Sequence, residues 1–162
     1  MPPWLYLDQN YLSGIAKRKP AFRELAPVLR AAVERGAVAV PESAAHRLES
    51  APRPDLRLLV LLRELSGGLV LPDEPDVNAH RRLLRVLERD FPERSLSAGD
   101  SVDIRTLASA LPRCRLVTCD AFMADVVRRA ALDVRFRAEL FTGRRADVER
   151  LTRVLSACEG YQ

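Results

Sequence analysis

Short apolar segments of strand length alternate with helical segments along this chain, and this alternation limits the folds that it can adopt. Residues 133–141 fit neither pattern. The strand candidates are residues 4–7, 37–40, 69–71 and 115–119. The helical candidates are residues 11–19, 22–35, 44–50, 56–65, 77–91, 102–111, 121–132 and 145–157. This order predicts an α/β fold in which a short parallel central sheet is covered by helices on both faces, a three-layer α/β/α sandwich.

The length and composition of the chain fit a single domain, residues 1–162. Apolar residues make up 48% and charged residues 30% of the sequence, which excludes a disordered chain. The three cysteines form an odd set without a Cys-x-x-Cys pair, which favours free thiols in a reducing compartment. No segment is typical of a signal peptide or a membrane span. We therefore expect a cytoplasmic protein with no membrane partner.

The chain is basic, with a formal net charge of +4, and Lys17 and Lys19 are its only lysines. A basic balance is compatible with a polyanionic partner such as RNA or DNA. An arginine-rich composition also produces such a surface without any nucleic-acid partner. Charge alone therefore leaves both interpretations open.

Acidic side chains follow two of the predicted strands at the point where each strand ends. Asp8 comes directly after residues 4–7, and Asp120 follows residues 115–119. Because the carboxyl ends of parallel strands meet at one edge of a sheet, we expect these two aspartates to lie close together. Asp103, before the second strand, and Glu49, on the helix after residues 37–40, can reach the same edge. The sequence therefore predicts a pocket that contains four carboxylates.

Carboxylates that converge repel one another, and either protonation or a divalent cation must relieve the repulsion. A set of oxygen ligands selects Mg²⁺ or Mn²⁺ over zinc, which prefers histidine and thiolate. Such ions orient a phosphodiester, lower the pKa of a bound water and stabilise the leaving oxygen. Metal-dependent hydrolysis of a phosphodiester is therefore the chemistry that suits these residues best.

Each of these residues also has a purely structural interpretation. Asp8 can form an Asx turn, Asp120 can cap the next helix, and Asp103 can favour the positive end of a helix dipole. Glu49 can be an exposed helical glutamate. Asp100 or Ser101 can cap the helix that contains Asp103. The two histidines, His46 and His80, lack a partner at metal-ligand spacing, and we expect both at the surface or at its boundary.

Four short motifs together resemble the PIN-domain nucleases, in particular the small ribonucleases that act as toxins in bacterial toxin–antitoxin pairs. The first is Leu5-Tyr6-Leu7-Asp8-Gln9-Asn10, an apolar strand followed by aspartate and asparagine. The second places Ser43 six positions before Glu49, and the third is Asp103 at the start of an alanine-rich helix. The fourth is Leu116-Val117-Thr118-Cys119-Asp120. The resemblance covers residues 4–125.

This resemblance implies a PIN-like fold and an endoribonuclease that uses Mg²⁺ or Mn²⁺. The acidic residues that it implies for catalysis and metal binding are Asp8, Glu49, Asp103 and Asp120, with Asp100 as a substitute for Asp103. It implies supporting polar roles for Asn10, Ser43 and Thr118. The implied partners are an RNA substrate, a cognate antitoxin protein and a second copy of the chain in a homodimer.

The chain also departs from the family pattern. Gln9 stands where the family usually has threonine or serine, and the interval from Asp103 to Asp120 is slightly shorter than usual. Residues 126–162 have no counterpart, and we expect a helical extension there. An alternative function is therefore a catalytically weak or inactive PIN-like module that binds RNA or a partner. A phosphatase with an aspartyl-phosphate intermediate is disfavoured, because Asn10 stands where it needs a second aspartate.

Overall fold

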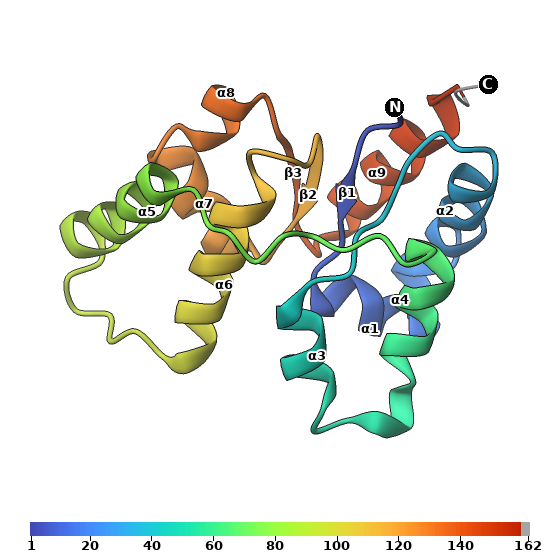
Figure 1. Ribbon diagram of the computed structural model, residues 1–162, viewed down its shortest axis with the longest axis horizontal. Coiled ribbons are helices and arrows are strands. Elements are labelled where there is room, and N and C mark those ends of the chain that lie inside the picture. The colour runs from blue at the N-terminus through green and yellow to red at the C-terminus, as the bar shows by residue number, and fades with distance from the viewer. Residues whose placement is uncertain (160–162) are drawn as a thin grey trace.

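A short parallel sheet lies at the centre of the molecule with helices around it, as the computed structural model of residues 1–159 shows (Figure 1). The fold is mixed α/β, as the sequence predicts. The strands, in their order across the sheet, are β1 (Leu5–Tyr6), β2 (Leu116–Thr118) and β3 (Glu139–Phe141). The α-helices are α1 (Gln9–Ala16), α2 (Leu25–Glu34), α3 (Ala44–Ser50), α4 (Leu58–Ser66), α5 (Val77–Asp90), α6 (Ala98–Ala110), α7 (Ala121–Arg129), α8 (Leu132–Phe136) and α9 (Arg145–Ala157). Two short 3₁₀ helices are η1 (Pro20–Phe22) and η2 (Pro54–Leu56).

Two of the predicted strands, residues 37–40 and 69–71, are reduced to single parallel bridges beyond β1. Trp4 pairs with Ala39, and Glu42 pairs with Val70. Because β1 also pairs with β2 on its other side, the early segments lie on one side of β1 and the late strands on the other. The strand order therefore changes direction between β1 and β2. In open parallel sheets, ligands bind beyond the carboxyl ends of the strands at such a point.

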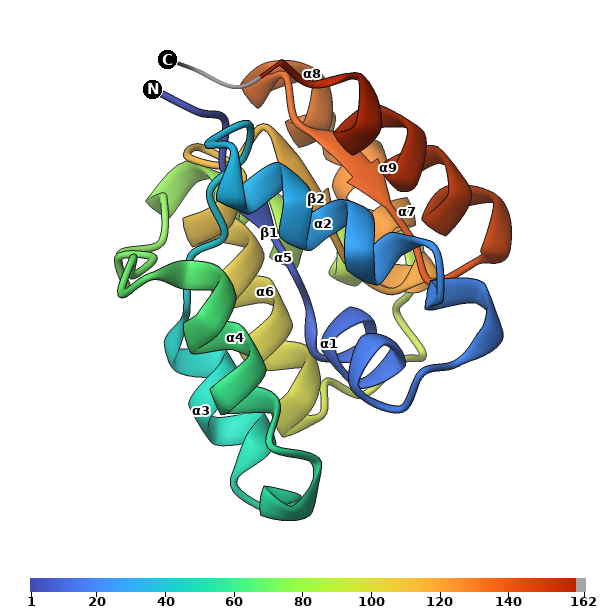
Figure 2. The same ribbon diagram turned by 90° about the vertical axis from the view of Figure 1, so that its right-hand side faces the viewer.

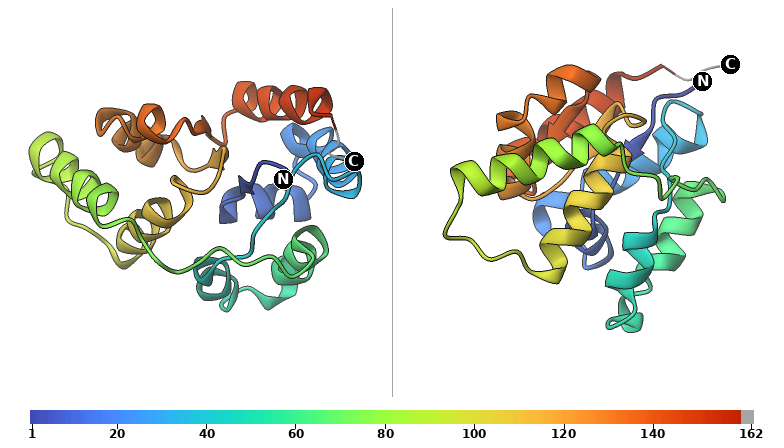
Figure 3. Two further views of the ribbon diagram at one scale, coloured as in Figure 1. Left: turned by 45° about the horizontal axis from the view of Figure 1, so that its top comes forward. Right: turned by 60° about the vertical axis from the view of Figure 1, so that its left-hand side comes forward.

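The alternation of side chains along the strands divides the interior into two cores, one on each face of the sheet. One core contains apolar residues of α5, α6 and α7, and the other contains residues of α1, α2, α4 and α9. In Figure 2, α2 lies beside α9 over one face of the sheet. The views in Figure 3 show α5 on the opposite side of the molecule from α9. Strand residues that face the first core are Tyr6, Val117 and Leu140, and those that face the second are Leu5, Leu116 and Phe141.

Several predicted helix boundaries are wrong, each for a local reason. Helix α6 begins earlier than residue 102, because Ser97 forms a capping box with Asp100 and replaces Asp100 and Ser101 as the cap. The predicted helix 121–132 breaks at Ala131, which has a φ of 54°. The helix predicted at residues 22–35 is divided into η1 and α2.

The C-terminal segment is not the helical extension that the sequence suggests. Within residues 126–159, β3 pairs with β2 as the third strand of the sheet, and α9 packs against α2. Phe141 and Leu151 are fully buried in the core. A strand of three residues, Glu139–Phe141, is too short for a periodic pattern to reveal it. The part of the prediction that concerns residues 160–162 lies outside the described residues.

We therefore expect Phe141→Ala to destabilise the whole domain by about 3 to 5 kcal/mol, because it leaves a large cavity in the second core. The matched control is Val134→Ala on α8, in the same segment but 76% exposed. That change is expected to alter the free energy of unfolding by less than about 0.5 kcal/mol. Urea denaturation of both variants measures the difference. Equal effects would show that β3 is peripheral.

Two further observations concern the cysteines and the length of the helices. Cys114, Cys119 and Cys158 are free thiols, as expected from their number and spacing. Among residues 1–159, none of the helices combines the length and the apolar character that crossing a bilayer requires.

Candidate functional site

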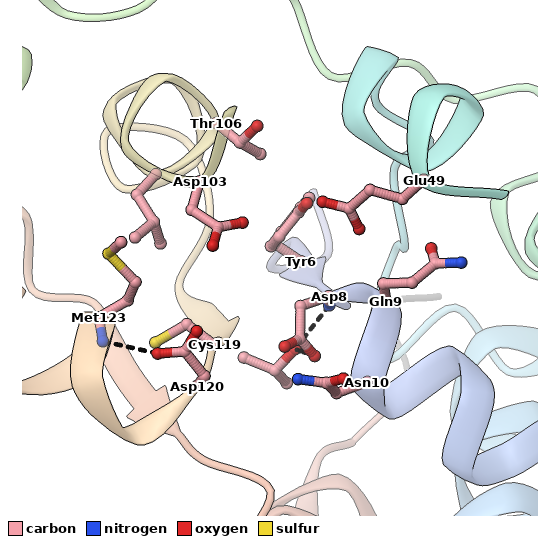
Figure 4. A pocket seen from close by; sticks show the side chains of 12 residues that line it. Tyr6, Asp8, Gln9, Asn10, Glu49, Asp103, Thr106, Cys119, Asp120 and Met123 are labelled. Atoms are coloured by element: carbon pink, nitrogen blue, oxygen red, sulfur yellow. Dashed lines mark hydrogen bonds between the residues drawn. The ribbon is translucent and has the colours of Figure 1, made fainter. Parts of the chain in front are cut away.

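A pocket of about 350 Å³ opens at the carboxyl ends of β1 and β2, where the strand order changes direction. All four carboxylates singled out in the sequence, Asp8, Glu49, Asp103 and Asp120, line this pocket. Figure 4 shows that they come from different segments and surround a common space. The pocket is therefore built by tertiary structure from residues that lie far apart in the sequence.

Asp8 and Asp120 are each fixed at the start of a helix that follows a strand. The Asp8 Oδ1 atom accepts a hydrogen bond from the backbone N–H of Tyr11, at 3.2 Å, and caps α1. The Asp120 Oδ1 atom accepts one from the N–H of Met123, at 2.7 Å, and caps α7. The structural interpretation of these residues and their place in the pocket are thus both correct. These bonds use only the Oδ1 atoms, and the carboxylates still face the pocket.

Thr118 connects the two strands that carry these aspartates. Its hydroxyl donates to Asp8 Oδ1 at 2.9 Å, and its oxygen accepts from the Asp8 N–H at 2.7 Å. Because Thr118 is fully buried, this pair fixes the Asp8 carboxylate against the end of β2. Thr118 also lines the pocket, as does Asn10, which is exposed at the start of α1. Both therefore stand where the sequence places supporting polar groups.

Glu49 and Asp103 approach from two helices on opposite sides of the pocket, α3 and α6 (Figure 4). Both are partly buried. Among residues 1–159, neither they nor Asp8 and Asp120 form an ion pair with a lysine, arginine or histidine. Four acidic groups without a cationic partner leave the pocket with a strongly negative potential.

Burial and charge repulsion together raise the pKa values of three of these carboxyl groups. Burial raises the pKa of Asp8 to about 6, and the neighbouring Asp120 carboxylate acts in the same direction. Burial also raises the pKa of Asp103 to about 7, with further repulsion from Glu49, Asp120 and Asp8. The pKa of Glu49 is raised by burial and by Asp8. Near neutral pH, the pocket therefore holds protons that a cation can displace.

The oxygen donors of the pocket suit a hard cation, but their present arrangement is not that of a closed metal site. Among residues 1–159, no three His, Cys, Asp or Glu side chains are arranged to hold a metal ion as they stand. The pocket nevertheless presents carboxylate oxygens, and Gln9 adds an amide whose buried Oε1 atom lacks a hydrogen-bond partner. The Gln9 Nε2 group donates to Ser50 at 3.2 Å. Oxygen donors of this kind fit Mg²⁺ or Mn²⁺.

Asp100, the substitute proposed for Asp103, does not line the pocket. Its Oδ2 atom accepts a hydrogen bond from the N–H of Ser97, and its Oδ1 atom pairs with Arg94 at 3.0 Å. The Ser97 hydrogen bond holds the pKa of Asp100 below its usual value, and Arg94 adds to the effect. Asp100 is thus a capping residue of α6, and Asp103 is the acidic residue of this helix that reaches the pocket.

Ser43 also lies outside the lining of the pocket. It is buried at the start of α3, where its hydroxyl caps the helix and its N–H donates to His46 Nδ1 at 2.9 Å. Ser43 therefore meets the pocket only through its neighbours His46 and Tyr6.

The expectation that His46 lies near the surface is wrong, since only 1% of it is exposed. Metal-ligand spacing could not reveal its hydrogen-bond partners, because they are the Leu7 carbonyl and the nearby Ser43. Its Nε2 atom lies 2.5 Å from the carbonyl oxygen of Leu7, and burial lowers its pKa. The two contacts assign a neutral ring with the proton on Nε2. His80 is half-buried, as expected.

Tyr6 is a pocket residue that the sequence analysis missed. Its ring is buried and stacks on His46, with centroids 5.3 Å apart, and its side chain lines the pocket. The sequence contains a signal that predicts this position, because Tyr6 precedes Asp8 by two positions and alternate side chains of a strand point to the same side. Thr106 on α6 also lines the pocket and was missed. It follows Asp103 by three positions, so the two share a helix face.

The site thus combines acidic side chains that can bind a hard cation with polar groups that can orient a substrate. Comparisons of the chain with family models, with curated proteins and with solved structures found no match.

Proposed function

We propose that this pocket is the active site of an endoribonuclease that hydrolyses phosphodiester bonds with the help of Mg²⁺ or Mn²⁺. The observation that carries the proposal is the meeting of four carboxylates, from four segments, in one pocket without a cationic partner. Carboxylates arranged in this way are destabilised by mutual repulsion unless a proton or a cation neutralises them. The basic balance of the chain as a whole, with a formal net charge of +4, suits an RNA substrate.

Asp8, Asp103 and Asp120 are the residues that would hold the cation, and Glu49 would either join them or orient the attacking water. When bound there, a divalent cation lowers the pKa of a water molecule and stabilises the oxygen that leaves. Thr118 keeps the Asp8 carboxylate in place through its hydroxyl. Where Glu49 orients the water and is not a ligand, its carboxylate, whose pKa is raised by burial and by Asp8, can take up the proton that the water loses.

The same proposal extends to the family and its partners. A parallel sheet with a core on each face, and with acidic groups at the ends of β1 and β2, supports a PIN-like three-layer sandwich. The four motifs in their order support membership of the toxin ribonucleases. If the chain is such a ribonuclease, we expect it to bind a cognate antitoxin protein and a second copy of itself.

The test is cleavage of a short, labelled single-stranded RNA by the purified protein. We expect cleavage with Mn²⁺ or Mg²⁺, none after chelation with EDTA, and recovery when Mn²⁺ is restored. The variant that tests the site is Asp8→Asn, which keeps the shape of the side chain, removes its charge and is expected to abolish cleavage. Cleavage that survives both chelation and Asp8→Asn would contradict the proposal.

A second candidate is a PIN-like module that binds RNA or a partner without cutting it. It is favoured by the absence, among residues 1–159, of a preformed group of three metal ligands and by Gln9, which is turned towards Ser50. The same RNA distinguishes the two functions. Binding that is unaffected by EDTA, together with intact RNA after long incubation with Mn²⁺, would favour the module.

A further inference from the structure

We infer that Tyr6 binds the substrate directly, by donating a hydrogen bond from its hydroxyl to a non-bridging oxygen of the scissile phosphodiester. The inference rests on the proposed ribonuclease function and adds a substrate-binding residue to it. Tyr6 is not one of the acidic residues that would hold the cation, so its contribution can be measured separately.

The position of Tyr6 on β1 directs its hydroxyl into the acidic pocket. Strand side chains alternate, so Tyr6 and Asp8 emerge on the same side of the sheet. Figure 4 shows the hydroxyl of Tyr6 between the carboxylates of Glu49 and Asp103. A group at this place would meet a phosphate that lies among the carboxylates.

The ring of Tyr6 is held firmly, which gives the hydroxyl a fixed direction. Only 5% of the residue is exposed, and its ring stacks on His46 with an interplanar angle of 23°. His46 is itself fixed by the Leu7 carbonyl on one side and by Ser43 on the other. A donor held in this way loses little conformational entropy when it binds a ligand.

The polar groups of the pocket differ in what they can offer a phosphate. The four carboxylates are acceptors when they are ionised, and they repel a phosphate. The Thr118 hydroxyl and the Gln9 amide already donate to Asp8 and Ser50. Asn10 and Thr106 also line the pocket, but Tyr6 is a buried donor whose hydroxyl lies between Glu49 and Asp103 (Figure 4), with Ser43 as its hydrogen-bond neighbour on the protein side. A phosphate in the pocket would take this hydrogen bond in place of Ser43.

The test compares two variants that each remove one tyrosine hydroxyl. Tyr6→Phe removes the hydroxyl in the pocket. The matched control, Tyr11→Phe, removes a buried hydroxyl that donates to the carbonyl of Thr142 at 2.5 Å. Three properties of each variant are measured: KM and kcat for the labelled RNA with Mn²⁺, RNA binding by anisotropy with Ca²⁺ to slow hydrolysis, and Mn²⁺ affinity from the thermal shift.

We expect Tyr6→Phe to weaken RNA binding and raise KM by about 10- to 100-fold, as for the loss of a hydrogen bond to a charged group. Its Mn²⁺ affinity should stay within about twofold of the original. Tyr11→Phe should lower Tm and leave RNA binding unchanged.

Three results would overturn the inference. The first is unchanged RNA binding in Tyr6→Phe, and the second is an equal loss of binding in both tyrosine variants. The third is a parallel loss of Mn²⁺ affinity, which would show that Tyr6 acts by positioning a carboxylate. A wild-type protein that neither binds nor cleaves RNA with any cation would instead refute the proposed function, and the inference with it.

Discussion

Asp103→Asn is expected to reduce metal-dependent RNA cleavage by about 10³-fold and, at the same time, to make the protein more stable. The loss of activity follows because a carboxylate that holds the cation contributes several kcal/mol to transition-state stabilisation. The gain in stability follows because Asp103 is a partly buried acid surrounded by Glu49, Asp120 and Asp8. Removing its charge removes this repulsion.

The sign of the stability effect depends on pH. In the folded protein the pKa of Asp103 is raised from 3.8 to about 7, so the folded state binds the proton more tightly than the unfolded state. The cost of ionising Asp103 is therefore absent below about pH 4, grows as the pH rises towards 7 and is complete above that. At about pH 8 we expect Asp103→Asn to gain about 1 to 2 kcal/mol, since water screens this half-exposed group. Thermal or urea unfolding without divalent cations measures this difference in the free energy of unfolding.

Asp100→Asn, three positions earlier on α6, is the matched control. Asp100 is engaged by Ser97 and Arg94 outside the pocket, so this variant should lose about 1 kcal/mol of stability and keep its cleavage rate within a few-fold. If Asp100→Asn abolished cleavage and Asp103→Asn did not, Asp100 would be the third acidic residue. A less stable Asp103→Asn at alkaline pH would contradict the electrostatic account of the pocket.

The second large effect concerns the pH dependence of cation binding. The pKa of Asp8 is about 6 and that of Asp103 is about 7, so both carry protons in part of the neutral range. A cation needs both ionised, which holds for about one molecule in 20 at pH 6 and about nine in ten at pH 8. The affinity for Mn²⁺ should therefore rise about 20-fold over this range. It falls as the pH decreases, because protons and the cation compete for the same oxygens.

Isothermal titration calorimetry in buffers of different ionisation enthalpy measures the affinity and the protons released. We expect about one to two protons released per cation at about pH 6 and almost none at about pH 8. In Asp103→Asn only Asp8 contributes, and the remaining rise should be about twofold. An affinity for Mn²⁺ that does not change with pH would place the cation away from these two groups.

Local patterns in the sequence were sufficient to predict several elements closely. Helix α3 and helix α9 have the boundaries that their periodicity predicts, and α5 differs by one residue. These helices carry clear amphipathic patterns or capping residues, which act within a few positions of the chain. The predictions failed where the outcome depended on distant partners, as at β3 and at the single bridges of Ala39 and Val70. Three residues without a regular pattern become a strand only when β2 lies beside them.

The buried polar groups could not be predicted from local sequence patterns either. His46 has no partner at metal-ligand spacing in the sequence, but the fold encloses it between Tyr6 and the Leu7 carbonyl. Asp100 and Asp103 could not be separated by position, because residues three apart share a helix face. The direction of α6 decides between them, since it turns Asp103 to the pocket while Arg94 holds Asp100 outside it.

The sequence by itself determined the alternation of strands and helices, and it placed Asp8 and Asp120 directly after two strands, because these features depend on neighbouring residues. Tertiary structure alone decided that β1 lies next to β2 and that Glu49 and Asp103 reach the same pocket. Tertiary structure also decided how strongly Asp8, Glu49 and Asp103 resist ionisation. The physical reason is that burial and charge repulsion depend on distances through space, which the order of residues does not specify.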